Sequence, residues 1–365
     1  MTKQVQISPI QLTILLMGFL FGTTVFIVSG FHAEQNAWIA FLLSWSGGIL
    51  LFACYVLLSK KFPQKTLVEI NKILLGNFLG SALSILYIWY FIHLGALILR
   101  NFGEYVVIAH MTETPLWFPI FLLLIISLYA TKSGLEVTSR TAELVVPLIF
   151  LFQLILTLSL ITEVDLSLLR PILQEGFPPV LRAAFSTLTF PFGETVVFLM
   201  IIPYLNKPTQ LKKTYLSAFL IVGLILFITL IRDITILGPR GIERKIFAPH
   251  LVAKHVAFVD FDAVIGIMFF ISSWTKLSVC YLGTTIGISQ LTNSNNHRLF
   301  VYPVGIILMG LSIWIYDSAS EMLSWAIDIW PLYSVPFQIL FPLLLLLISF
   351  FKKDRTQNKE STYSD

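Results

Sequence analysis

Apolar runs long enough to cross a membrane recur along the whole chain, and they constrain its fold more than any other feature. A membrane-spanning helix needs about 20 predominantly apolar residues. Ten segments come close to this requirement: 10–30, 37–58, 78–108, 116–131, 141–162, 181–205, 214–238, 258–290, 299–316 and 333–351. Since backbone polar groups in lipid must be hydrogen-bonded internally, such runs fold as helices. The sequence therefore predicts an all-α membrane protein, with a single transmembrane domain over 1–351 and a short polar tail over 352–365.

The composition agrees with residence in a bilayer and argues against several classes of function. Of the 365 residues, 56% are hydrophobic and 12% are charged, whereas soluble proteins carry roughly 25% charged residues. No basic patch with interleaved aromatic residues is visible, so nucleic acid is not an expected partner. Cys54 and Cys280 lie in apolar runs and are expected to be small buried hydrophobes. The six histidines show no metal-ligand spacing and no nucleophile constellation is visible, so we expect no metal, no cofactor and no enzymatic activity.

Lysine and arginine predict how the chain is oriented in the membrane, because cytoplasmic loops are enriched in these residues. With the N-terminus inside, the cytoplasmic segments hold most of them: Lys3, Lys60, Lys61, Lys65, Lys72, Lys132, Arg140, Lys207, Lys212, Lys213, Arg298, Lys352, Lys353, Arg355 and Lys359. The outer loops at 31–36, 109–115 and 317–332 hold none, and the outer loop at 239–257 is an exception. An even number of spans then predicts that both termini are cytoplasmic.

Span one is interrupted by Gly22-Thr23-Thr24 in the middle of its apolar run. Glycine permits unusual backbone angles, and threonine hydroxyls can bond the backbone groups that an unwound turn sets free. A glycine used only for close helix packing would leave the same pattern, so both interpretations stand at this point. Spans one and six occupy corresponding places in two five-span halves, as expected for a five-plus-five inverted repeat.

Span six carries the stronger interruption, Phe190-Pro191-Phe192-Gly193-Glu194. Pro191 has no N–H group to continue a helix, and Glu194 is an ionisable group inside an apolar run, which is costly and typical of functional sites. The alternative is a simple proline kink with Glu194 paired to neighbouring backbone. In the functional interpretation, N–H groups at the start of a half-helix receive an anionic ligand group, and Glu194 receives an ammonium group. Together these groups suit a zwitterion such as an amino acid.

Two further pairs of charged residues lie inside apolar runs. Arg100 and Glu104 are four residues apart on span three, so they share a helix face and can pair. Arg232 and Asp233 are adjacent on span seven, and adjacent residues do not face each other on a helix. We therefore expect Arg232 and Asp233 each to find a partner elsewhere or to reach a wet cavity.

Span eight holds Lys276 too far from either interface for its side chain to extend easily to water. Ser273, Lys276, Cys280 and Thr284 follow one another at steps of three and four residues, which places them on one helix face. This polar stripe has two interpretations of equal weight. Either it lines a functional cavity, or Lys276 is neutralised by a structural Glu or Asp.

These residues together resemble the spore germination permease family, the B subunits of nutrient germinant receptors. The resemblance covers essentially the whole chain and depends on the order and spacing of several stretches: Asn36-Ala37-Trp38-Ile39, Ser59-Lys60-Lys61-Phe62-Pro63, Lys65-Thr66-Leu67-Val68-Glu69, Leu99-Arg100-Asn101-Phe102-Gly103-Glu104, Glu113-Thr114-Pro115-Leu116-Trp117, Gly134-Leu135-Glu136-Val137, Val164-Asp165-Leu166, Arg170-Pro171-Ile172-Leu173, Phe190-Pro191-Phe192-Gly193-Glu194, Leu237-Gly238-Pro239 and Lys276. The family looks like a branch of the amino acid–polyamine–organocation superfamily. The resemblance therefore implies a LeuT-like five-plus-five inverted repeat with broken helices one and six.

The resemblance also implies a function, partners and a site. A small germinant such as an amino acid would bind in the centre and trigger germination, in the spore inner membrane, together with an A subunit and a lipoprotein C subunit. The candidate substrate-binding residues are Gly22, Thr23, Thr24, Tyr90, Phe190, Gly193, Glu194, Ser273 and Thr284. The candidate ion-site or gating residues are Lys276, Glu104 and Arg100. Lys276 would stand in for the cation that related transporters hold between spans one and eight, with its ammonium group facing the break near Gly22.

A proton-coupled secondary amino acid transporter would have the same fold and the same site, so the residues alone do not separate it from a receptor subunit. Genes for A and C subunits beside this one would favour the receptor. Accumulation of substrate by the purified protein in liposomes would favour the transporter.

Overall fold

The computed structural model describes residues 5–22, 31–238, 247–253, 256 and 261–352, and these residues are almost entirely helical. The α-helices are α1 (Pro9–Phe21), α2 (Ala37–Lys61), α3 (Leu67–Ala109), α4 (Trp117–Ser133), α5 (Leu135–Ser159), α6 (Pro178–Thr187), α7 (Leu211–Leu237), α9 (Ala248–Ala253), α10 (Asp262–Leu291), α11 (Val301–Trp314), α12 (Ala319–Ser324), α13 (Trp330–Val335) and α14 (Phe341–Phe351). Three π-helical segments lie at Leu188–Phe192, Trp325–Ile329 and Pro336–Leu340. The 3-10 segments lie at Phe31–Asn36, Ile161–Glu163, Leu166–Leu169, Gly193–Met200, Ile202–Tyr204, Pro208–Gln210 and His297–Phe300.

The predicted spans are confirmed as helices. Among the described residues, eight helical stretches are long and apolar enough to cross a membrane, and the shorter apolar helix α4 coincides with predicted span four. The other short apolar helix, α1, covers the first part of predicted span one, whose residues 23–30 lie outside the described residues. Helix α3 begins before its predicted span, and a positive φ of 82° at Gly76 kinks this first part away from the apolar run. The π-helical segments Trp325–Ile329 and Pro336–Leu340 join α12, α13 and α14 into one continuous helical stretch, which forms the last span. Of the predicted tail, only Lys352 lies within the described residues.

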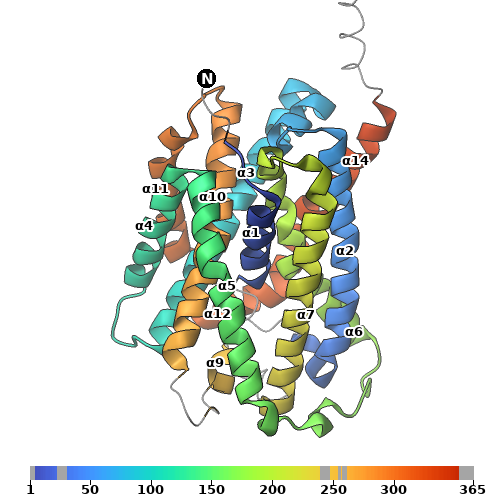
Figure 1. Cartoon of the computed structure of the whole chain (residues 1–365), viewed down its shortest axis with the longest axis vertical. Coiled ribbons are helices and arrows are strands. Elements are labelled where there is room, and N and C mark those ends of the chain that lie inside the picture. The colour runs from blue at the N-terminus through green and yellow to red at the C-terminus, as the bar shows by residue number, and fades with distance from the viewer. Residues whose placement is uncertain (1–4, 23–30, 239–246, 254–255, 257–260, 353–365) are drawn as a thin grey trace, which may run out of the picture.

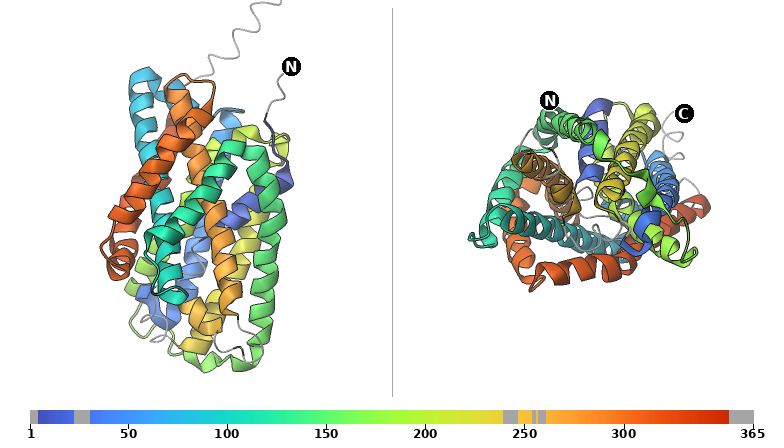
Figure 2. Two further views of the ribbon diagram at one scale, coloured as in Figure 1. Left: turned by 90° about the vertical axis from the view of Figure 1, so that its left-hand side faces the viewer. Right: turned by 90° about the horizontal axis from the view of Figure 1, so that it is seen from below.

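The helices run side by side along the long axis of the molecule (Figure 1) and surround a central region when seen end-on (Figure 2). The short helix α1 packs against α5, α7 and α10, and α3 packs against α4, α10 and α11. The second half of α1 is buried almost throughout. Helix α1 therefore lies inside the bundle, and its C-terminal end at Phe21 points into the interior.

The outer surface of the bundle is apolar. Large apolar side chains are exposed on α4, α5, α11 and α14, including Ile126, Leu144, Ile306 and Leu347. Extended apolar surfaces mark interaction with another apolar phase. On helices of this length, that phase is the hydrocarbon of a bilayer. Polar and charged side chains inside the bundle are therefore surrounded by protein and not by lipid.

The first described residues and the end of α14 lie at the same end of the bundle (Figure 1), which we call the N-terminal end. Here Ile7 pairs with Leu205 at the end of span six in an isolated parallel bridge. The Ile7 N–H donates to the Tyr204 carbonyl at 2.9 Å, and the Asn206 N–H donates to the Ile7 carbonyl at 3.0 Å. Helix α1 begins directly afterwards, with Ser8 and Gln11 in a capping box that satisfies two free N–H groups. The entry into span one is thus attached to the end of span six.

Candidate functional site

The predicted interruption of span one is confirmed at Gly22. Helix α1 stops at Phe21, and Gly22 has φ 26° and ψ −129°, a conformation that only glycine adopts readily. A Cβ atom at Gly22 would lie 2.6 Å from the Phe19 carbonyl oxygen and 2.7 Å from Lys276 Cδ. Because Gly22 has no side chain, the chain can turn here and the Lys276 side chain can approach closely. Thr23 and Thr24 lie outside the described residues.

The predicted interruption of span six is also confirmed. Helix α6 ends at Thr187 and continues as the π-helical segment Leu188–Phe192, in which Phe190 has non-helical angles (φ −137°, ψ 107°). Pro191 has no N–H to donate. The Gly193 N–H donates to the Leu188 carbonyl, so the Thr189 carbonyl that it would reach in an α-helix is left for a side chain.

Glu194 and Lys276 form one buried ion pair at these two breaks. Lys276 Nζ lies 2.5 Å from Glu194 Oε2, and the exposed fractions of the two side chains are 0% and 1%. The ammonium group also lies over two aromatic rings, 4.6 Å from the centroid of Phe190 and 5.4 Å from that of Phe19. Cation–π contacts of this kind gain strength when the cation is desolvated. The two charged residues lie on separate predicted spans, six and eight, and in the structure they pair with each other.

The ion pair affects the expected role of Glu194, which was to receive the ammonium group of a ligand. In this conformation Lys276 supplies the ammonium group that we expected a ligand to bring. Of the two interpretations of Lys276, the structure favours neutralisation by an intramembrane carboxylate. The other carboxylate oxygen, Glu194 Oε1, has no hydrogen-bond partner among the described residues. A buried acceptor without a hydrogen-bond partner costs free energy.

The remaining residues of the polar stripe on α10 are buried. Ser273, Cys280 and Thr284 are each at most 1% exposed. The Thr284 hydroxyl donates to the Cys280 carbonyl of its own helix at 2.9 Å, whereas Ser273 Oγ has no hydrogen-bond partner in the described part of the chain. Since a helix rises about 1.5 Å per residue, Ser273 and Thr284 lie roughly 16 Å apart along α10, so one small solute does not contact both. Cys54 and Cys280 are both buried and free.

A network of neutral groups at the break of span six was missed by the sequence reasoning. Gln338 Nε2 in the last span donates to the Thr189 carbonyl at 2.9 Å and to Tyr90 Oη at 2.8 Å. Tyr55 Oη on α2 lies 2.6 Å from the Gln338 carbonyl and 3.2 Å from the Gly193 carbonyl. Tyr90, a predicted site residue, is therefore connected to the break through Gln338. The available signal was an amide inside an apolar run between Pro336 and Pro342.

The predicted pair of Arg100 and Glu104 is confirmed, with 2.8 Å between Arg100 Nη2 and Glu104 Oε1. Arg100 Nη1 also donates to the Ile313 carbonyl at 2.9 Å, at the C-terminal end of α11. Cations are favourable at a helix C-terminus. The pair thus connects α3 to α11, and a role in ion binding or gating stays a prediction.

The expectation for Arg232 and Asp233 was wrong. These adjacent residues pair with each other, since Arg232 Nη2 lies 2.6 Å and Nε 2.9 Å from Asp233 Oδ1. Adjacent side chains leave a helix in different directions, but the long arginine side chain folds back around the helix and its planar fork reaches the carboxylate. Arg232 Nη1 also donates to Thr157 Oγ1 on α5 at 3.1 Å.

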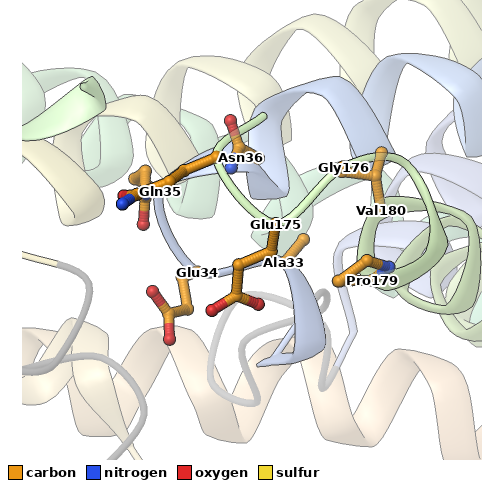
Figure 3. A pocket seen from close by; sticks show the side chains of 9 residues that line it. Ala33, Glu34, Gln35, Asn36, Glu175, Gly176, Pro179 and Val180 are labelled. Atoms are coloured by element: carbon orange, nitrogen blue, oxygen red, sulfur yellow. The ribbon is translucent and has the colours of Figure 1, made fainter. Parts of the chain in front are cut away.

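Two cavities lie at opposite ends of the bundle. At the N-terminal end, a cavity of about 230 Å³ is lined by Gln6, Thr66, Glu69, Tyr204 and Gln290, among others. At the other end, a cavity of about 40 Å³ lies between the segment before α2 and the start of α6. Figure 3 shows the carboxylates of Glu34 and Glu175 pointing to the same side of this second cavity. Within the described part of the chain, no three His, Cys, Asp or Glu side chains come together as metal ligands.

The described residues form an all-α membrane bundle in which two spans break beside a buried ion pair, and its fold is of the class that solved structures of transporters show. Two of the solved structures that share this fold illustrate the likeness. One is MhsT in complex with L-phenylalanine, with a TM-score of 0.64 and 14% identity over 98% of this chain and 95% of that chain. The other is Mhp1, a nucleobase-cation-symport-1 family transporter in a closed conformation, with a TM-score of 0.62 and 11% identity over 95% of this chain and 90% of that chain. The fold is thus LeuT-like, with two inverted five-span repeats.

Within this class, the chain belongs to the spore germination protein family, whose family model matches residues 6–321. Spore germination protein KB of Bacillus subtilis (strain 168) is 33% identical over 366 residues, covering 98% of both chains. Spore germination protein YndE of the same organism is 26% identical over 299 residues, covering 78% of this chain and 81% of that protein. The family and the fold are those of permeases and transporters.

Proposed function

We propose that this chain is the nutrient-sensing subunit of a spore germination receptor. A small solute such as an amino acid binds where spans one and six break, and its binding triggers germination. The observation that carries the proposal is the buried pair of Glu194 and Lys276, which lies beside both Gly22 and Phe190. The membership in a germination family and the likeness to a structure holding L-phenylalanine support it.

The geometry suggests how a zwitterion is recognised. Its ammonium group approaches Glu194, whose Oε1 has no hydrogen-bond partner among the described residues. Its carboxylate approaches the start of the half-helix after Pro191, where the helix dipole favours an anionic group. Both ligand charges then meet opposite protein charges or dipoles, so the buried site stays neutral, as a low-dielectric interior requires.

Lys276 has a second part in the proposal. Its ammonium group is a cation tethered to α10 and held against the end of α1 at Gly22. We propose that it takes the place of a bound metal cation between spans one and eight, so that the site needs no dissolved sodium. A Lys276→Ala protein that reaches normal level and keeps full nutrient response contradicts this role.

The proposed setting is the inner membrane of the spore, with one transmembrane domain over 1–351 and both termini in the cytoplasm. The partners are an A subunit and a lipoprotein C subunit. An even number of spans would bring both termini to one side, and the start of the described chain and the end of α14, which lie at the same end of the bundle (Figure 1), support this. We propose no catalytic activity for the chain.

The experiment that tests the proposal is nutrient-triggered germination of spores lacking this gene, complemented with variants. We expect spores without the gene to lose the response to at least one amino acid, and the wild-type gene to restore it. Gly22→Ala and Glu194→Gln should shift the dose-response curve at normal protein level. Asp233→Asn is the matched control, because it disrupts a buried ion pair elsewhere on α7. If Gly22→Ala and Glu194→Gln both leave the dose response unchanged, the proposed site is wrong.

A proton-coupled amino acid transporter is the alternative, favoured by the likeness of the fold to two transporter structures. Purified protein in liposomes distinguishes the two functions. Accumulation of an amino acid driven by a pH gradient would support transport, whereas binding without accumulation would support a receptor subunit.

A further inference from the structure

One amide side chain connects the last span to the break of span six. Gln338 is fully buried and donates through Nε2 to both the Thr189 carbonyl and Tyr90 Oη. A backbone carbonyl oxygen accepts hydrogen bonds and never donates them. The amide nitrogen, and not the oxygen, must therefore face Thr189, and this fixes the orientation of the whole Gln338 side chain.

The other atom of the same amide covers Gly193. A Cβ atom added at Gly193 would collide with Gln338 Oε1 and Cδ, so the oxygen lies directly against the glycine. Since Thr189 and Gly193 flank Pro191, one side chain touches the break of span six at both ends. The Gly193 N–H donates to the Leu188 carbonyl, so the Thr189 carbonyl does not receive the bond that an α-helix would supply from Gly193.

The backbone of the last span is held in return by tyrosines of other spans. Gln338 lies in the π-helical segment Pro336–Leu340. Tyr87 Oη on α3 donates to the Phe337 carbonyl at 2.9 Å, and Tyr55 Oη on α2 lies 2.6 Å from the Gln338 carbonyl. A tyrosine hydroxyl has one proton to donate, so Tyr55 divides it between the Gln338 carbonyl and the more distant Gly193 carbonyl. The break of span six and the π-helical segment thus share Gln338 and Tyr55.

We propose that Gln338 is a positioning residue that couples the break of span six to the π-helical segment of the last span. When the central site is filled, the two segments change conformation together. The proposal rests on the proposed function for the location of the ligand, which contacts Gly193 and Glu194, while Gln338 acts through Thr189. Movement of one segment alone would leave the buried Thr189 carbonyl unsatisfied, which is unfavourable, so joint movement is preferred. Segments of π-helix are frequent at sites where function requires such adjustment.

The test compares Gln338→Met with Gln153→Met in the purified full-length protein, by hydrogen exchange without added ligand. Methionine keeps the length of the side chain and removes the donor. Gln153 is the matched control, because it is a buried glutamine on α5 that donates to Thr229 Oγ1 on α7 at 2.5 Å. We expect Gln338→Met to speed backbone exchange over both 188–200 and 336–341 by roughly tenfold or more, in line with the loss of buried hydrogen bonds. Gln153→Met should leave both segments unchanged.

A second measurement separates positioning from simple stabilisation. Spores carrying Gln338→Met are tested with each of the twenty L-amino acids in turn, and protein level is followed on immunoblots. We expect the half-maximal concentration of the active amino acid to rise roughly tenfold at unchanged maximal rate. Tyr90→Phe, which removes one of the two bonds, should give a smaller rise.

Two results would overturn the coupling. One is that Gln338→Met leaves exchange over 188–200 unchanged, and the other is that exchange rises there without any rise over 336–341. If the exchange differences are present but wild-type spores respond to no amino acid, the coupling stands and the proposed function fails.

Discussion

Removing one partner of the buried pair of Glu194 and Lys276 should destabilise the protein far more than removing both. Lys276→Met or Glu194→Gln alone leaves a desolvated charge without its partner, which costs about 3–5 kcal/mol. Unfolding entropy is roughly 2.1 cal/mol/K per residue, so over 365 residues this loss lowers Tm by about 4–7 °C. In the double variant no charge is left behind, and replacing a buried pair by neutral groups is often neutral or stabilising. The double variant should therefore recover most of the lost Tm.

The assay is thermal unfolding of the wild-type protein, the two single variants, the double variant and a control variant, all purified in one detergent at one pH. Lys65→Met is the control, because Lys65 and Glu69 form an ion pair that is 46% and 33% exposed. An exposed pair of this kind is worth about 1 kcal/mol or less, so Tm should move by about 1 °C. The reasoning is refuted if the single variants unfold within 1 °C of the control, or if the double variant loses the sum of both single losses.

Three further changes test other parts of the structure. Gly22→Ala places a Cβ atom 2.6 Å from the Phe19 carbonyl at a positive φ, a strain of about 1–2 kcal/mol, so the thermal midpoint should fall; an unchanged midpoint would show that the turn can relax. Arg100→Met leaves Glu104 buried without its guanidinium, and thermal unfolding should show a loss of about 3–5 kcal/mol; a loss below 1 kcal/mol would mean that Glu104 finds another partner. Ser8→Ala removes the cap of α1 and should cost about 1 kcal/mol in the same assay, and a larger loss would indicate that the bridge at the N-terminal end also opens.

The sequence was sufficient to predict the spans and their two interruptions, because these depend on local chemistry. A run of about 20 apolar residues folds as a membrane helix whatever its neighbours are. Pro191 cannot complete a helix, and Gly22 has no side chain to oppose a positive φ. The pairing of Arg100 with Glu104 was also local, since residues four apart share a helix face.

Contacts between distant segments were beyond the reach of the same reasoning. Glu194 and Lys276 lie on different spans, and only the packing of span six beside α10 makes them partners. Gln338 was overlooked because a neutral amide in an apolar run gives a weaker signal than a charge. For Arg232 and Asp233 the spacing rule failed for a different reason, since it describes where side chains leave the helix and not how far an arginine reaches.

The most direct test of the central claim is equilibrium binding of each of the twenty L-amino acids to the purified protein. The account predicts that the wild-type protein binds at least one of them, that Gly22→Ala and Glu194→Gln weaken this binding, and that Asp233→Asn preserves it. Binding that Gly22→Ala and Glu194→Gln leave unchanged would place the ligand elsewhere and contradict the account.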